Sequence, residues 1–440
     1  MATPFKIQVE PQNSGLLGLK LGQSEASKVT DLLQRDLDNH HVFFNESGFH
    51  DHIVHHVLTL YGTGATTKAL DTAYNANKTY QLKAMKPKPE IIDKLEHSSD
   101  WSQYLGKGRN YATFFRFFQN EIGRIGWQDT LKEYLFKDDA RGRDMQSRLF
   151  AGILHPLIQL LYGMEWSQPM IIASALAQTA VHRDDYHEFL TLAAEKAKAV
   201  DAPPKMKSLG SLYEDAVKDE KLRTSSHWDD SNRILDGVFT RAKDEMTTLA
   251  AGVRVDEDEL DERMAEMVHN SAFVASAAAF HPPYSPRHHI TSTPFFLTLK
   301  EQSWIPASTK AHFLENKIRM DLLQYIACGS PALRGDLLRE YKPKDENNLA
   351  DKPEDLLARI HNIVDDGHTV KLARALILAQ RVTMPYEDKE WVKIKGNDEW
   401  LRAMYLLLDA NEEANRQGGT LWVRSSGFDK AWEEIPKAKM

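Results

Sequence analysis

The stretch Glu25-Ala-Ser-Lys-Val-Thr-Asp-Leu-Leu-Gln-Arg-Asp-Leu-Asp-Asn39 shows the pattern that decides the fold. Its apolar residues Val29, Leu32, Leu33 and Leu37 lie three and four positions apart, the spacing of a helix with one buried face. The same periodicity predicts further helices over residues 48–61, 111–125, 145–164, 169–182, 256–280, 309–327 and 355–380. From residue 24 onward, the sequence is therefore dominated by helical patterns.

Strand signals are few and short. They are confined to residues 6–9 and 420–423, and no fixed-period repeat is present. We therefore expect an all-α fold, a single large irregular helical domain with few or no short strands. Within it, we expect an extended N-terminal strap over residues 1–23, a helical domain over residues 24–385, and a C-terminal segment over residues 386–440 packed on the same domain.

The composition excludes several classes of protein. Hydrophobic residues make up 42% of the 440 positions, enough for a substantial core, and the net charge is −8. Without a basic tract, this charge argues against binding to nucleic acid or to an anionic membrane surface. A single cysteine, Cys328, allows no intrachain disulfide, and neither a signal peptide nor a run of about 18 apolar residues is found. We expect a cytoplasmic protein.

Several catalytic motifs are absent from the sequence. It contains no G-x-x-x-x-G-K-[ST] loop, no G-x-G-x-x-G turn after a strand, no G-x-S-x-G, no C-x-x-C pair and no H-E-x-x-H. A flavin or nicotinamide bound by a Rossmann fold is therefore not expected.

Histidines are unusually frequent and clustered. Of the 18 in the chain, several occur in His50-Asp-His52-Ile-Val-His55-His56, where His52 and His56 lie one helical turn apart. His155 interrupts the apolar run Leu149–Ile158, where burying an unpaired imidazole would cost about 1–3 kcal/mol. A metal ion or a backbone carbonyl would offset that cost, so both explanations stay open.

A third candidate segment is Asp365-Asp-Gly-His368-Thr-Val-Lys371, which places His368 and Lys371 on one helical face. A lysine in a dry pocket loses its proton more easily than one in water, and the neutral amine can react with carbon dioxide to give an anionic carbamate. A surface lysine is the alternative. The last candidates, His288 and His289, follow a Pro-rich loop and could equally be solvated.

Five blocks of sequence, in the same order, resemble the questin oxidase-like family. They are Asn39-His-His-Val-Phe-Phe-Asn45, Gly48-Phe-His-Asp-His-Ile-Val-His-His56, Leu60-Tyr-Gly-Thr-Gly-Ala65, Leu149-Phe-Ala-Gly-Ile-Leu-His-Pro-Leu-Ile158 and Asp365-Asp-Gly-His-Thr-Val-Lys-Leu-Ala-Arg374. The resemblance covers roughly residues 30 to 385, which would make residues 24–385 the catalytic domain.

The resemblance implies an oxygenase of fungal polyketide metabolism. Members of the family are described as opening a ring of anthraquinones, toward benzophenone or xanthone products. The step was long written as a Baeyer–Villiger oxidation with NADPH, and at least one relative is a dioxygenase whose non-haem iron is bound by four histidines and a carboxylated lysine. The partners implied are an aromatic polyketide and dioxygen.

Carried over motif by motif, the implied metal ligands are His52, His155, His288, His368 and Lys371. His56 is the alternative to His52. His289 is the alternative to His288, because the preceding Tyr284-Ser-Pro-Arg is more polar than the family's aromatic run. Asp366, Glu165 and Tyr162 are candidates to orient the ligands.

Neutral imidazoles with one anionic oxygen suit Fe(II) or Mn(II), and we expect Fe(II) as the cofactor. NADPH is a further possible cofactor, although no motif for it is recognisable. Three alternatives stay open: an NADPH-dependent Baeyer–Villiger oxidase without bound iron, a zinc-dependent hydrolase, and a non-catalytic helical protein that binds a partner. Phe114 to Phe118 and Trp166 either line a flat pocket or fill the core.

Overall fold

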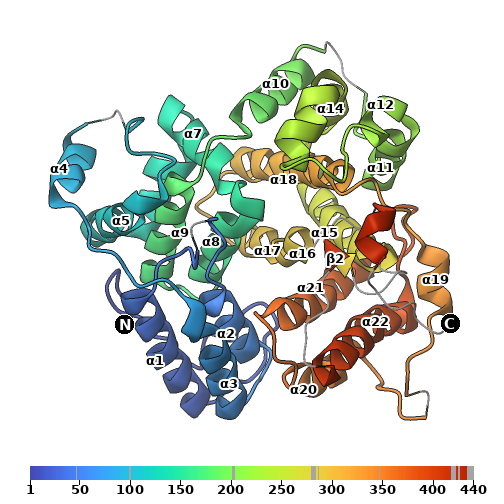
Figure 1. The fold of residues 1–440 in the computed structure, drawn as a ribbon, viewed down its shortest axis with the longest axis horizontal. Helices are drawn as coiled ribbons and strands as arrows, with labels where there is room; N and C mark the ends of the chain where they lie inside the picture. The colour runs from blue at the N-terminus through green and yellow to red at the C-terminus, as the bar shows by residue number, and fades with distance from the viewer. Residues whose placement is uncertain are drawn as a thin grey trace. The chain divides into compact units, whose positions relative to one another are not determined.

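The structure of the chain is a computed structural model that describes all residues except 46, 99–100, 201–203, 279–283, 286, 346, 418–422, 425–426 and 434–440. The chain, drawn as a ribbon in Figure 1, divides into two compact units by its internal contacts. The first unit comprises Met1–His187 with Val364–Lys371, and the second comprises Glu188–Ile363 with Leu372–Met440. The predicted division at residues 23 and 385 stays a prediction.

Both units are built from helices, so the predicted all-α fold is confirmed. Within the described residues, the only strands are β1 (Tyr284–Ser285) and β2 (Val423–Arg424), which form a short parallel pair in the second unit. Nor does any described helix combine the length and the apolar character needed to cross a bilayer.

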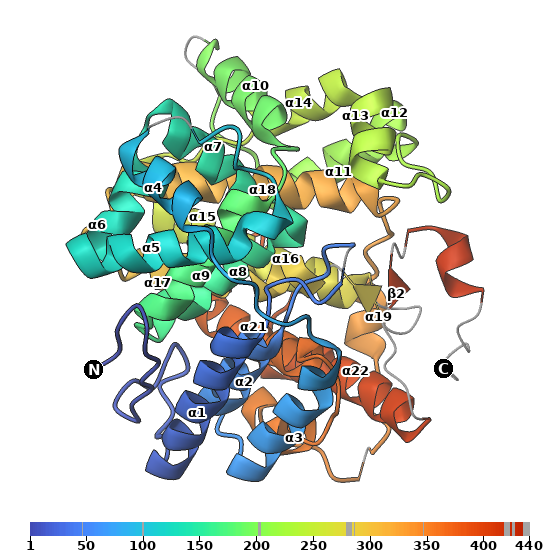
Figure 2. The same ribbon diagram turned by 60° about the vertical axis from the view of Figure 1, so that its left-hand side comes forward.

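The first unit packs its helices in two groups. Helix α2 lies against α1, α3 and α8, and helix α9 lies against α5, α7 and α8. Figure 2 shows α1, α2 and α3 side by side. The helices of this unit are α1 (Gln23–Asn39), α2 (Ile53–Gly62), α3 (Thr67–Asn77), α4 (Pro89–His97), α5 (Tyr111–Ile125), α6 (Trp127–Leu131), α7 (Ala140–Leu149), α8 (His155–Glu165) and α9 (Pro169–Val181).

The core of the first unit centres on helices that are buried on every side. All ten residues of α2 are buried, and so is every residue of α9 from Met170 to Val181. Of the aromatic residues predicted either to line a pocket or to fill the core, Phe114, Phe117, Phe118 and Trp166 are buried, and Phe115 is half-buried. Phe114, Phe117 and Phe118 pack around Trp101 with ring centroids 5.1–6.1 Å apart.

The second unit is arranged around α15 and α18, which pack against each other and against α11. Its helices are α10 (His187–Lys198), α11 (Leu209–Lys218), α12 (Glu220–Arg223), α13 (Phe239–Arg241), α14 (Lys243–Ala251), α15 (Leu260–Ala277), α16 (Arg287–Thr291), α17 (Pro294–Lys300), α18 (Ala307–Ala327), α19 (Gly335–Glu340), α20 (Leu357–Ile360) and α22 (Gly396–Arg416). Helix α21 (His368–Thr383) begins in the first unit and continues into the second.

The helix predicted over residues 48–61 begins later than expected. It starts at Ile53, because the Asp51 carboxylate accepts the Ile53 amide over 2.8 Å and His50 forms an isolated bridge with Phe43. A short polar side chain that bonds its neighbouring backbone competes with helix formation. His52 therefore stands at the N-cap of α2 and not inside the helix.

The helix predicted over residues 355–380 is broken. Helix α20 ends at Ile360, and α21 begins only at His368. Gly367 has φ +89, and Asp365 accepts the backbone amides of Gly367 and Thr369 at 2.6 and 2.9 Å. A left-handed glycine and a carboxylate that caps the next helix make a defined start for α21.

The strand predicted at residues 6–9 is wrong. The amides of Ile7 and Val9 donate to the side chains of Gln34 and Thr30 on α1, so they are not available to a neighbouring strand. Of the strand predicted at residues 420–423, Val423 lies in β2, and residues 420–422 lie outside the described residues.

Candidate metal centre

Three of the predicted ligands converge inside the first unit. The Nε2 atoms of His52 and His155 lie 2.8 Å apart, and their rings are nearly parallel. The ring of His368 meets that of His52 edge-on, with the centroids 4.7 Å apart. All three side chains are buried. Each stands at the start of a helix: His52 at the N-cap of α2, and the other two as the first residues of α8 and α21.

Asp366 holds two of these rings in one orientation. Its Oδ2 lies 3.2 Å from Nδ1 of His52, and its Oδ1 bonds Nδ1 of His368. Although burial opposes ionisation, His368 and His52 hold the pKa of Asp366 well below its usual range. An ionised carboxylate only accepts, so both Nδ1 atoms carry a proton, and when the rings are neutral both Nε2 atoms present lone pairs. This is the orienting contact predicted for Asp366.

The third ring is fixed by backbone. Nδ1 of His155 donates to the carbonyl of Gly152 over 2.6 Å. The carbonyl is brought there by three successive left-handed residues, Gly152, Ile153 and Leu154, with φ of 55, 55 and 66. Such a conformation costs on the order of 1–3 kcal/mol at each non-glycine residue and is found mostly at functional sites. In the neutral ring, the Nε2 atom of His155 therefore also presents a lone pair.

These tautomers place two lone pairs face to face, between the Nε2 atoms of His52 and His155. A proton shared between the two Nε2 atoms, or a metal ion that accepts both lone pairs, would remove the repulsion. Because a metal–nitrogen bond is about 2.1 Å long, such an ion would lie to one side of the 2.8 Å line that joins the two atoms. Burial lowers the pKa of His155 well below its usual value, and the charges of His52 and Lys371 lower it further. A shared proton is therefore costly in this buried pair, and the nitrogen donors fit the implied ion.

A neighbouring histidine pair serves as a contrast. The Nε2 atoms of His50 and His182 also lie 2.8 Å apart, and Nδ1 of His182 donates to the carbonyl of Gln178. A neutral His50 can donate from its Nε2, so an ordinary N–H···N hydrogen bond explains this pair. The ring of His50 stacks on that of His155 with the centroids 3.9 Å apart, so it covers one side of the candidate centre.

Lys371 belongs to the same interior region. It follows His368 by one helical turn and is only 2% exposed, so the surface alternative does not hold. After burial itself, its positive charge is the largest influence that lowers the pKa of both His55 and His56, the latter to about 3. The carbamate predicted on Lys371 would replace this positive charge with a negative one.

His56, the alternative to His52, packs against the start of α21. A Cβ added to Gly367 would lie 2.6 Å from Cγ of His56, so only glycine allows this approach. The contact brings the segment carrying Asp366 and His368 onto α2.

The fourth predicted histidine lies in the second unit. His288 is on α16, and its side chain is outside the described part of the structure, so its role stays a prediction. Its alternative, His289, is buried, and its Nδ1 bonds the carboxylate of Asp321, which also accepts Nζ of Lys317 at 2.5 Å.

The other two orienting candidates contact different groups. The ring of Tyr162 stacks on His55 with centroids 5.3 Å apart, and its hydroxyl bonds Oγ1 of Thr59 at 2.6 Å. Glu165 accepts the amide of Leu16 at 2.9 Å.

Sequence reasoning assigned no role to His50, His55 or His182, although all three surround the centre. His55 follows His52 by three positions, so the helical spacing of the two residues is a signal that could have found it. His182 ends α9 and carries no local signal, because its partner His50 is 132 residues away.

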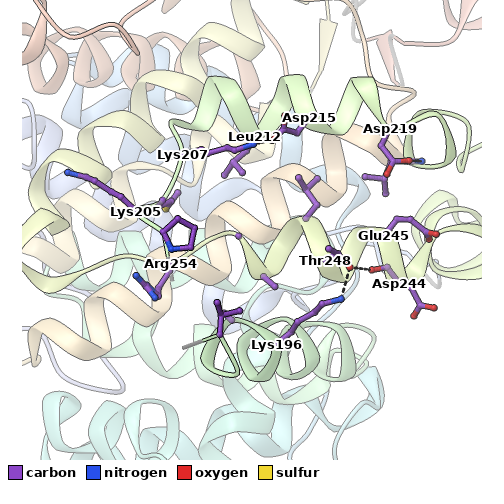
Figure 3. Close-up of a pocket in the computed structure, with 18 residues that line it drawn as sticks. Lys196, Lys205, Lys207, Leu212, Asp215, Asp219, Asp244, Glu245, Thr248 and Arg254 are labelled. Carbon is purple, nitrogen blue, oxygen red and sulfur yellow. Dashed lines mark hydrogen bonds and ion pairs between the residues drawn. The ribbon is translucent and has the colours of Figure 1, made fainter. Parts of the chain in front are cut away.

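The described residues contain a second cluster of possible metal ligands and a cavity. Asp36, His40 and Asp51 form a second cluster of possible ligands. Burial raises the pKa of Asp36 to about 7, and a proton shared with Asp51 explains that cluster. The second unit contains a cavity of about 600 Å³, in which Lys207 pairs with Asp215 and Lys196 bonds Thr248 (Figure 3). Its described lining includes none of the five predicted ligands.

The chain is similar to known proteins over most of its length. The sequence profile of the questin oxidase-like family matches residues 49–376. The oxidoreductase AflY of Aspergillus parasiticus is 35% identical, over 99% of this chain and 94% of the relative. The questin oxidase of Aspergillus fumigatus is 31% identical over 99% and 100% of the two chains, and the Baeyer-Villiger monooxygenase dmxR6 of a Cryptosporiopsis species is 31% identical over 97% and 98%. This chain therefore belongs to the questin oxidase-like family, and it is an oxidoreductase.

Proposed function

We propose that this protein is a non-haem, Fe(II)-dependent dioxygenase that cleaves a ring C–C bond of an anthraquinone-type polyketide in fungal secondary metabolism. The observation that carries the proposal is the pair of opposed lone pairs on His52 and His155. Their other nitrogens both bond oxygen acceptors, so in the neutral rings both Nε2 atoms can donate a lone pair to a common ion, which supports the proposal. Relatives named as questin oxidase and Baeyer-Villiger monooxygenase support the substrate class.

The residues that would hold the ion are His52, His155 and His368 through Nε2, Lys371 as a carbamate, and His288. Borderline nitrogen donors with one hard anionic oxygen match the preference of Fe(II). When bound, the ion would supply the activation of dioxygen toward an electron-rich aromatic ring.

The rest of the chain prepares this donor set. Asp366 and the carbonyl of Gly152 fix three tautomers before any ion arrives, so little reorganisation accompanies binding. The buried apolar residues Ile53, Val57, Leu154 and Leu157 lie on the same segments as the ligands and exclude water around them. A dry surround strengthens each electrostatic contact at the centre.

The proposal is tested by metal content and oxygen uptake. Protein purified without oxygen is analysed for bound metals, and oxygen consumption is then followed with an anthraquinone or its hydroquinone. His155→Ala is expected to abolish stoichiometric iron and oxygen uptake, whereas His97→Ala, at an exposed position on α4, keeps both. A His155→Ala protein that retains iron and turnover would overturn the proposal.

The names of the relatives favour a second candidate, an NADPH-dependent Baeyer–Villiger oxidase without bound iron. The two candidates differ in one measurement. Oxygen uptake by fully chelated protein that depends on NADPH would establish the second, and uptake that returns only with added Fe(II) would establish the first. Bound zinc with an activity independent of oxygen would instead point to the hydrolase alternative.

A further inference from the structure

The cavity of about 600 Å³ in the second unit has an apolar floor. Leu212 on α11, Leu222 on α12 and the preceding Met206 are all buried, and Leu249 on α14 lines the cavity beside them. Helices α11, α12 and α14 pack against one another around this floor. Cavities that bind small organic molecules have volumes of about 300–1,000 Å³. The floor therefore offers room for a molecule with a compact hydrophobic body.

The charged side chains of the cavity are separated along its length. Figure 3 shows Lys205 and Arg254 at one end and Asp244 and Glu245 at the opposite end. Lys205 and Asp244 are exposed, whereas Arg254 and Glu245 are half-buried. The cavity thus combines an apolar floor with a cationic end, and an organic anion with an apolar body is complementary to both.

Most of the carboxylates that line the cavity already have partners. Asp215 pairs with Lys207 at 2.6 Å, and Glu245 pairs with Lys221 at the same distance. The carboxylate of Asp219 accepts an amide from the first turns of α12 at 3.0 Å. Their charges are therefore offset locally, and they oppose a bound anion less than free carboxylates would.

Two of the lining cations are less completely paired. Within the described residues, the one ion pair of Arg254 is with Asp256 at 3.7 Å, which is too long for a hydrogen bond. Nζ of Lys196, on α10, donates to the neutral hydroxyl of Thr248 over 2.7 Å, and the described part of the chain places no carboxylate within ion-pair distance of it. Both groups keep N–H donors for an anion, and a guanidinium matches the two oxygens of a carboxylate.

The neighbours of Arg254 favour an aromatic ring over an aliphatic chain. A guanidinium group stacks on the face of an aromatic ring, and a thioether such as that of Met206 makes favourable contacts with ring edges. Both side chains line the same cavity as Leu212 and Leu249.

We propose that this cavity is a binding site for a small aromatic carboxylate. The rings lie on Leu212 and Leu249, Arg254 binds the carboxylate, and Lys196 adds a second positive charge. The site goes beyond the proposed function, because its described lining includes none of the proposed metal ligands and binding there requires no metal ion.

The probe is 4-benzoylbenzoate, which joins two aromatic rings to one carboxylate, and its methyl ester is the uncharged control. Affinity of the full-length protein for both is measured by calorimetry. Ultraviolet light then attaches the bound benzophenone to nearby C–H groups, and mass spectrometry locates the label. We expect label in peptides that cover residues 204–222 and 244–254, and weaker binding of the ester by about 10-fold or more, since hydrogen bonds to charged groups are the strong ones.

Substitutions test the two cations separately. Arg254→Gln is expected to weaken binding of the acid by about 10-fold or more and to leave binding of the ester unchanged. Lys196→Met should weaken binding of the acid by about threefold, because solvent screens its exposed ammonium group. Arg334→Gln is the matched control, since Arg334 also pairs with an aspartate two positions on but does not line the cavity.

Three results would overturn the proposal. One is the absence of binding of 4-benzoylbenzoate at millimolar concentration, and another is photolabel confined to peptides outside residues 196–254. The third is equal affinity for the acid and its ester, or for the acid in Arg254→Gln and the original protein, because either would show that no charge in the cavity recognises the carboxylate.

Discussion

At the scale of single residues, the centre is defined by which nitrogen of each ring carries its proton. Asp366 decides this for His52 and His368 together, since one carboxylate accepts from both Nδ1 atoms. An asparagine has only one accepting atom, and its NH₂ group would oppose the N–H of one ring.

We therefore predict that Asp366→Asn lowers the affinity for Fe(II) by about 10–100-fold, the usual cost of losing such an orienting partner. Metal titration of the purified protein measures the effect. Asp138→Asn, at a fully exposed carboxylate, is the matched control and should leave the affinity unchanged. An equal affinity in the two variants would contradict the assigned role of Asp366.

A second prediction concerns His269 in the second unit, a buried histidine whose pKa is lowered to about 3, chiefly by burial. Its Nε2 accepts the amide of Lys393 at 2.8 Å, so it is held neutral. The unfolded chain takes up the proton near pH 6.5, whereas the folded chain does so only near pH 3. The contribution of neutral His269 to the free energy of unfolding is fully present above pH 6.5 and is lost as the pH falls toward 3.

Between pH 6.5 and 3, this residue should lower the free energy of unfolding by about 1.4 kcal/mol for each pH unit. His269→Gln keeps an acceptor for the amide and cannot take up the proton, so its stability should fall less steeply over that range. Thermal unfolding at a series of pH values gives the two slopes. Parallel curves would show that His269 is not kept neutral by the fold.

At the scale of elements, three of the proposed ligands, His52, His155 and His368, lie where helices begin, and these starts were the least predictable part of the chain. The bodies of α1 and α5 follow from apolar spacing, because one face of each is buried. The start of α2 depends on Asp51 and that of α21 on Asp365. Both are side-chain contacts to backbone, which periodicity does not encode.

Gly367 permits a contact that no other residue allows, since its φ is +89 and a Cβ would lie 2.6 Å from His56. Gly367→Ala is predicted to lower the free energy of unfolding by more than about 1 kcal/mol, the cost of a left-handed residue alone, and to weaken metal binding as α21 is displaced. Denaturant unfolding and metal titration measure the two effects. Gly123→Ala, where a Cβ meets open space, is the control. A Gly367→Ala protein that binds metal normally would contradict this account.

At the strained turn before α8, a substitution is expected to raise the free energy of unfolding. Ile153 is exposed and left-handed, a conformation that is especially unfavourable for a β-branched residue. Ile153→Asn should raise the free energy of unfolding by about 1 kcal/mol, because asparagine tolerates this region. Metal affinity should not change, since the Gly152 carbonyl keeps its position. A fall in stability, measured by denaturant unfolding, would count against strain at this residue.

At the scale of the whole molecule, the sequence predicted the fold class but not the division into two units, and the ligand set stays a prediction. The ligand prediction depended on resemblance, since His52 and His155 are separated by more than a hundred positions and nothing local pairs them. Two networks were not foreseen: the pairing of His50 with His182, and the chain of hydrogen bonds from His55 to Tyr111. Both connect side chains that only the packing of α2, α5, α8 and α9 brings together.

If the ion joins three distant segments, its effect on backbone motion should be shared among them. We predict that adding Fe(II) without oxygen slows hydrogen exchange together in peptides that cover residues 52–62, 152–165 and 364–371. Each of these three segments contains one of the proposed ligands His52, His155 and His368. Peptides from α4 should not change. Protection that appears in only one of the three segments would show that the rings do not bind a common ion.

The last eight residues of the first unit come from far along the chain, after the whole stretch 188–363. A ribosome making this protein therefore releases His52 and His155 long before it delivers Asp366, His368 and Lys371. Until then the two early imidazoles have no partner segment to complete their set. If the protein binds iron as proposed, loading of the ion would accordingly wait until synthesis is nearly finished, and the growing chain would not carry a half-ligated, redox-active ion.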